Sequence, residues 1–165
     1  MTAALSDNED ATSVLKDALA AHQLEAGPVE GFPAVLTAIA ERASGRWSLF
    51  AQTDQAAAGV LVYSVFPRRT PEDRRPAMAE FGARVNYLLR YGDIEMDFDD
   101  GEVRVRTSAR GGPEPLSFFV AAELVAANLE ASELVFPAIE EVALKGRSPS
   151  EALADVLSGL TAETG

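Results

Sequence analysis

The sequence contains no cysteine, one histidine and one tryptophan among its 165 residues. The absence of cysteine excludes disulfides, thiolate metal sites and cysteine nucleophiles. The single histidine, His22, has no identifiable catalytic partner in the sequence, so it gives little support to acid–base chemistry. We find no nucleophile–base pair, metal cluster or phosphate loop in the sequence. We therefore expect a protein that is not an enzyme and that needs no cofactor.

Long apolar runs are also missing, because no stretch approaches the ~18 apolar residues of a membrane-spanning helix. The first thirteen residues have neither a basic start nor an apolar core, so they do not resemble a signal peptide. We therefore expect a cytoplasmic protein. The chain has 14 basic and 26 acidic residues, a net charge of −12. Such a surface repels nucleic acid and anionic lipid, and it favours a basic or apolar partner.

Helical periodicity predicts several helices, each with a start or stop signal in the sequence. The first runs from near Asp10 to before Gly27, and a second ends at Gly92. The others are expected at 117–131, from Ser132 through Lys145, and from the capping box Ser148–Glu151 to about Leu157.

Alternation of apolar and polar residues predicts the strands. Residues 34–41 are ambiguous, because their alanines suit a helix while their alternation suits a strand; we interpret them as a strand. Residues 46–52 alternate clearly. Residues 60–66 are apolar on both faces, which is typical of a strand covered on both sides. If helices cover one face only, the other face is a candidate partner surface.

A hairpin is the firmest local prediction, with Asp100–Gly101 as the two turn residues of a type I′ loop. This register places Met96 opposite Val105 and pairs the charged residues as Asp97–Arg104 and Glu95–Arg106, each worth ~0.2–1 kcal/mol. It also requires positive φ at both turn residues. An EF-hand loop starting at Asp97 would need glycine at position six and glutamate at position twelve, which this sequence lacks, so we predict no metal site.

The order of these elements is α-β-β-β-α-β-β-α, which indicates an α+β domain with a five-stranded antiparallel sheet. We expect a disordered N-terminus at 1–9, the α+β domain at 10–146, and a short helix with a tail at 147–165.

Several short motifs in this order resemble the YbjN family of proposed bacterial sensory transduction regulators, whose fold is similar to that of type III secretion chaperones. The matching residues extend over about 10–146 and comprise Trp47 with Leu49, Val62–Tyr63–Ser64, Pro71–Glu72, Glu80–Phe81, Asn86–Tyr87, Gly92, residues 100–104, and Leu134 to Gly146 with Pro137 and Ile139. The resemblance implies a chaperone-like fold and a non-enzymatic, dimeric, protein-binding module. It carries over no catalytic residues.

Two groups of polar residues have alternative interpretations. The arginines at 68, 69, 74 and 75 could hold an anion or an acidic peptide, but such clusters more often neutralise neighbouring carboxylates. Asn86 could belong to a binding surface, but an asparagine in a helix more often bonds to backbone groups; we favour that interpretation.

The function that we predict is binding of a protein or peptide, through burial of apolar surface and pairing at a sheet edge. Because the chain is acidic, we expect segments with basic flanks. A small-ligand protein or enzyme with a pocket between sheet and helices is one alternative, and a structural homodimer is another. The candidate partner-binding residues are Trp47, Leu61, Tyr63, Val65, Arg68, Arg69, Arg74, Arg75 and Asn86.

Overall fold

The computed structural model describes residues 3–54, 59–110 and 116–162. Residues 1–2 and 163–165, which belong to the predicted disordered N-terminus and the predicted tail, lie outside the described residues. The elements in chain order are α1 (Ala3–Ala21), β1 (Gly27–Val29), β2 (Phe32–Arg42), β3 (Gly45–Asp54), β4 (Gly59–Val65), the 3₁₀ helix η1 (Glu72–Arg74), α2 (Arg75–Asn86), β5 (Asp93–Met96), β6 (Val103–Arg110), α3 (Phe118–Leu144) and α4 (Pro149–Ala162).

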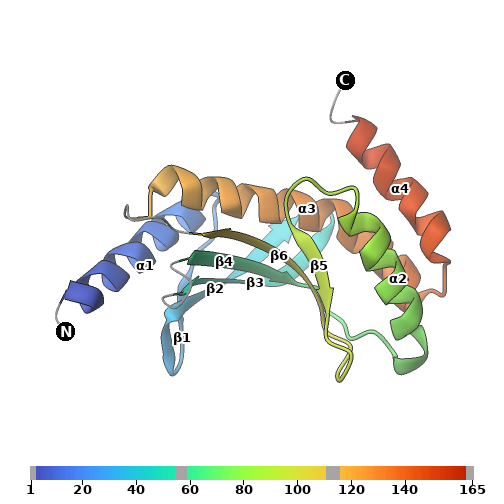
Figure 1. The fold of residues 1–165 in the computed structure, drawn as a ribbon, viewed down its shortest axis with the longest axis horizontal. Helices are drawn as coiled ribbons and strands as arrows, with labels where there is room; N and C mark the ends of the chain where they lie inside the picture. The colour runs from blue at the N-terminus through green and yellow to red at the C-terminus, as the bar shows by residue number, and fades with distance from the viewer. Residues whose placement is uncertain (1–2, 55–58, 111–115, 163–165) are drawn as a thin grey trace.

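The strands form one antiparallel sheet in the order β1-β2-β3-β4-β6-β5. Figure 1 shows α1 and α3 lying along one face of this sheet, with α2 and α4 at the end near β5. The α+β class with an antiparallel sheet is confirmed, but the sheet has six strands rather than five. The additional strand, β1, is three residues long and contains Pro28, so its sequence has the appearance of a helix-breaking loop.

The ambiguous segment at 34–41 is a strand, as predicted, and forms the middle of β2. Its alternation places Leu36, Ala38 and Ala40 in the core, and the intervening residues are more exposed. In β4 the same period buries Val60, Val62 and Ser64. Alternating side chains point to opposite faces of a sheet, so each strand has a helix-covered side and an uncovered side.

A buried polar network ties α3 to the covered face. Asn128 of α3 is fully buried, and its Nδ2 donates to the carbonyl oxygens of Val62 at 3.0 Å and Val105 at 3.1 Å. Its Oδ1 accepts from the Ser64 hydroxyl at 2.6 Å, and Ser64 accepts from Trp47 Nε1 at 2.8 Å. One amide therefore bridges β4 and β6, and buried groups of this kind stabilise a structure only when they are paired.

The helices differ from prediction at four boundaries. α2 ends at Asn86 rather than at Gly92. α1 begins at Ala3 rather than near Asp10, because alanine and leucine at its start favour a helix. α3 continues through Ser132 and Pro137 instead of restarting there; the Ser132 hydroxyl donates to the Asn128 carbonyl oxygen and caps no helix. The capping box before α4 is confirmed, because Glu151 N donates to Ser148 Oγ at 3.4 Å and Ser148 N donates to the Glu151 carboxylate at 3.3 Å. α4 runs beyond Leu157 to Ala162.

α4 packs against α2 and α3 and buries Ala152 and Val156. Part of the predicted C-terminal segment at 147–165 thus packs on the predicted domain at 10–146, and the boundary between them stays a prediction. In the described part of the chain, every helix is too short or too polar to cross a membrane.

The hairpin forms, but its predicted register is wrong by two residues. Met96 pairs with Val103 and Glu95 with Arg104, so residues 97–102 form a longer loop. The loop is held by local hydrogen bonds, including Gly101 N to the Asp97 carbonyl oxygen at 2.9 Å. Gly101 has φ of +78°, as predicted, whereas Asp100 does not have positive φ. A shift of two residues leaves the side chains of β5 and β6 on their predicted faces.

Candidate functional site

The uncovered face of the sheet is the candidate functional site, and we call it the open face. None of the described helices lies against it (Figure 1). Half-buried or exposed apolar side chains occupy its centre, on three neighbouring strands: Val35 and Ile39 of β2, Phe50 of β3, and Leu61, Tyr63 and Val65 of β4. Ile39 is 45% exposed. Contiguous apolar surface that a folded chain leaves uncovered is a common mark of an interaction site.

Charged residues of β5 and β6 border this apolar strip. The carboxylate of Glu95 accepts from Arg104 at 2.8 Å and from Arg106 at 3.2 Å. The Arg104 guanidinium also lies over the Tyr63 ring, 4.3 Å from its centroid. Phe50 and Tyr63 are cross-strand partners, and Tyr63 in turn faces Arg106. The open face therefore changes from apolar at β2 to ionic at β5.

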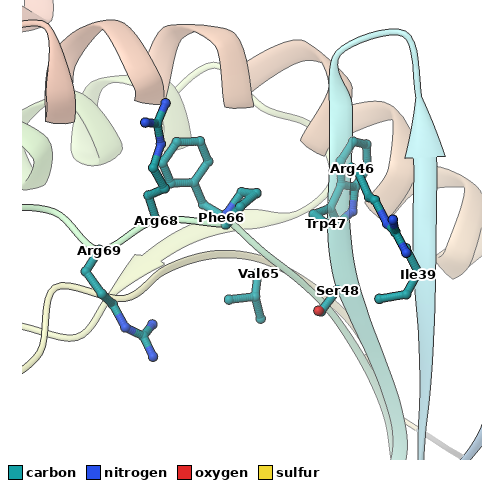
Figure 2. Close-up of a pocket in the computed structure, with 9 residues that line it drawn as sticks. Ile39, Arg46, Trp47, Ser48, Val65, Phe66, Arg68 and Arg69 are labelled. Atoms are coloured by element: carbon teal, nitrogen blue, oxygen red, sulfur yellow. The ribbon is translucent and has the colours of Figure 1, made fainter.

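Two adjoining hollows open on this face and share Ser48 and Val65 as lining residues, and we refer to them together as the hollow. The first, about 500 Å³, extends over Ile39 and Arg46 to Arg68 and Arg69. The second, about 550 Å³, extends over Phe50 and Tyr63 to Arg104. Figure 2 shows the Trp47 and Phe66 side chains turned toward the helices, while Ser48 and Val65 point the opposite way.

Leu61, Tyr63 and Val65, the three β4 residues predicted to bind a partner, lie together on the open face. Trp47 lies on the opposite face and is 3% exposed. Its ring packs edge-to-face against Phe136 of α3, with centroids 5.1 Å apart. Trp47 is among the residues that line the first hollow, but its indole lies in the core, on the face of β3 opposite to Ser48 and Phe50.

The four arginines at 68, 69, 74 and 75 do not form one site. Arg74 donates to carbonyl oxygens of Val142 and Arg147 and so closes the end of α3. Arg75 donates to the carbonyl oxygen of Phe98 at 2.7 Å. Both side chains therefore hold neighbouring backbone in place.

The other two arginines lie at the rim of the hollow. Arg68 pairs with Glu140 at 3.1 Å, and Arg69 pairs with Glu102 and with Asp100. The hydrogen bond to Glu102 raises the pKa of the Arg69 guanidinium. An arginine is cationic in any case, so Arg69 presents a charge, paired with two carboxylates, at the rim of the hollow.

Asn86 makes the backbone bonds that the sequence favours over a binding role. Its Nδ2 donates to the Ile94 carbonyl oxygen at 3.1 Å, and its Oδ1 accepts from Ile94 N at 2.8 Å. Ile94 lies in β5, the edge strand of the sheet. The amide therefore occupies backbone groups that a further strand would use, a common way of blocking an edge.

Sequence reasoning did not select Ile39, Arg46, Phe50, Arg104 and Arg106. The alternation in β3 already indicated that Phe50 lies on the same face of the strand as Ser48. The arginines of β6 were explained by cross-strand ion pairs, which they do form. The sequence did not indicate which face of the sheet the helices leave uncovered.

Fold and site together define an α+β protein whose antiparallel sheet is covered by helices on one side and carries an apolar depression on the other. Among solved structures, the chain is similar to YbjN from E. coli, a proposed transcription regulator, with a TM-score of 0.55 and 11% identity over 78% of this chain and 89% of that one. It is also similar to a chain of the HopA1–SchA chaperone–effector complex, with a TM-score of 0.49 and 17% identity over 72% of this chain and 87% of that one. No protein-family model matches the sequence, and no curated protein matches it. The YbjN resemblance is therefore confirmed as a likeness of fold.

Proposed function

We propose that this protein is a non-enzymatic, cytoplasmic module that binds a polypeptide segment on the open face, in a chaperone-like or regulatory role. One observation carries the proposal: the sheet leaves six apolar side chains of β2, β3 and β4 without a helical cover. Burial of such side chains contributes roughly 25 cal/mol per Å² of apolar surface. Phe50 and Tyr63, which face each other across β3 and β4, are the aromatic anchors of the proposed surface.

The face supports this proposal better than the sheet edges do, which refines the edge-pairing mechanism expected from the sequence. At one edge, Asn86 already occupies the Ile94 backbone. At the other edge, β1 contains Pro28, which has no N–H to donate to a further strand. A segment lying across the face needs neither edge.

A second copy of the chain is the other occupant that the open face suits, since an apolar surface of this kind also favours a symmetric dimer. Light scattering at micromolar concentration separates the two states. A particle twice as heavy as the 17.5 kDa chain, reverting to monomer on Phe50→Thr with Tyr63→Thr, would assign the face to self-association. A monomer keeps it available for another protein.

Site-specific photocrosslinking tests the proposal. A photoreactive phenylalanine analogue replaces Tyr63 in one protein and Tyr91 in another; Tyr91 is 73% exposed and lies between α2 and β5, outside the open face. We expect polypeptide adducts in lysate from position 63 and few from position 91, with the adducts lost when Phe50→Thr is added.

Equal adducts at positions 63 and 91 would contradict the proposal. A small molecule that co-purifies in stoichiometric amount, with no adduct at position 63, would favour the ligand-binding or enzymatic alternative instead.

A further inference from the structure

The charged residues that line the hollow are mostly basic, whereas the chain as a whole is acidic. Its charged lining residues are four arginines and one glutamate: Arg46, Arg68, Arg69, Arg104 and Glu102. The whole chain has 14 basic and 26 acidic residues. A basic depression on an acidic protein is a local feature that net charge does not reveal. From this contrast we propose that the segment bound on the open face is acidic as well as apolar, with carboxylates that contact the arginines of the hollow.

The arginines retain donors for such carboxylates although each is ion-paired within the chain. A guanidinium has five N–H groups. Arg46 contacts Glu41 through Nε at 3.3 Å. Arg104 contacts Glu95 through Nε and Nη2, both at 2.8 Å. The existing pairs orient the guanidinium groups, and the remaining N–H groups can donate to a second carboxylate.

The geometry also limits what the segment can be. From Ile39 on β2 to Arg104 on β6 the hollow crosses three interstrand spacings of ~4.8 Å, which about four residues of extended chain can cover. The apolar floor then accepts aliphatic or aromatic side chains between carboxylates that reach Arg46 on one side and Arg69 and Arg104 on the other (Figure 2). A long polyanion such as nucleic acid is disfavoured, because it would meet the acidic surface outside the hollow.

This inference rests on the proposed function and reverses one expectation from the sequence. The net charge alone favoured segments with basic flanks. The lining of the hollow favours acidic ones, because charges at contact distance act at lower dielectric and with less screening than charges spread over the surface.

Selection from a random dodecapeptide phage library tests the inference with an unbiased probe. Four proteins serve as bait: the wild type, the charge variant Arg46→Gln with Arg104→Gln, the apolar variant Phe50→Thr with Tyr63→Thr, and the control Arg84→Gln with Arg90→Gln. The control removes the same charge from exposed positions in and after α2, outside the hollow. Circular dichroism and thermal unfolding establish that each bait is folded.

We expect the wild type and the control to enrich the same acidic, apolar peptides. Their synthetic forms should bind the charge variant about tenfold more weakly at low ionic strength and should not bind the apolar variant. Enrichment of neutral or basic peptides that need Phe50 and Tyr63 but not the arginines would overturn the acidic segment and leave the proposed function standing.

Equal loss of binding in the control and charge variants would also overturn the inference, since it would reflect net charge alone. Equal binding of the selected peptides to the wild type and to the apolar variant would overturn the proposed function itself.

Discussion

The two faces of the sheet are built from the same strands but differ in what their side chains do. On the covered face, Leu49 is fully buried and Asn128 ties β4 and β6 to α3. On the open face, the next residue along β3, Phe50, is half-buried and pairs across the strands with Tyr63. Adjacent residues of one strand therefore serve two purposes, core formation and, as we propose, recognition.

The largest expected effect on stability compares two adjacent residues of β3, one on each face of the sheet. Leu49→Ala should lower the free energy of unfolding by about 3 kcal/mol, because it opens a cavity in the core between the sheet and the helices. Phe50→Ala should cost about 1 kcal/mol or less, because the ring is partly in water already. Denaturant unfolding of both variants measures the difference. Equal losses would mean that the open face is part of a buried interface.

The next effect concerns the loop that holds Arg69 beside the open face. Thr70 N donates to the Gly101 carbonyl oxygen at 2.8 Å. A Cβ at Gly101 would overlap the Thr70 carbonyl oxygen, in addition to the strain of a β-branched residue at positive φ. Gly101→Val should therefore cost about 2–3 kcal/mol.

Gly146 provides the matched control for this prediction. It has φ of +77°, close to the +78° of Gly101, but its Cβ would meet nothing within 4 Å. Gly146→Val therefore reports backbone strain alone. If thermal unfolding gives the same loss for both variants, the contact between the loop and Thr70 contributes nothing.

The register of this hairpin shows where sequence reasoning reached its limit. A shift of two residues preserves the faces of Ile94, Met96, Val103 and Val105, so alternation cannot distinguish the predicted pairing from the observed one. Charge did not decide either, because Glu95 can pair with Arg106 or with Arg104, and it contacts both.

The α+β class and most element positions followed from periodicity and capping residues, because these are local signals. Packing partners were not local. Trp47 has the pattern of any strand residue, and only the position of α3 places it in the core beside Phe136. Ser132 could cap a helix by its type, but its hydroxyl bonds four residues back within a continuous helix. For the open face, the only indication in the sequence was the strand at 60–66, which is apolar on both sides.

A smaller effect is expected from the polar network of the covered face. Asn128→Ala should cost about 2 kcal/mol, since it removes the acceptor of the Ser64 hydroxyl and the side-chain donor to two strand carbonyls. Trp47 is the only tryptophan and bonds to Ser64, so its fluorescence should shift in the folded variant. An unchanged emission spectrum and unchanged stability would show that the network does not hold α3 on the sheet.

The smallest effect on stability is expected on the open face, at Tyr63. Tyr63→Thr keeps a residue that favours strands and removes the ring under Arg104, a contact worth roughly 0.5–1 kcal/mol at an exposed site. The free energy of unfolding should therefore fall by about 1 kcal/mol at most, while binding of any segment to the open face should be lost.

As a control for self-association, the unfolding measurement is repeated over a range of protein concentrations. Two results together would mean that the ring is buried against a second copy: a loss as large as that of Leu49→Ala, and a wild-type stability that rises with protein concentration. Association stabilises the folded state by mass action. A small, concentration-independent loss leaves Tyr63 available to a partner, and the two faces of the sheet then keep the separate roles that their burial indicates.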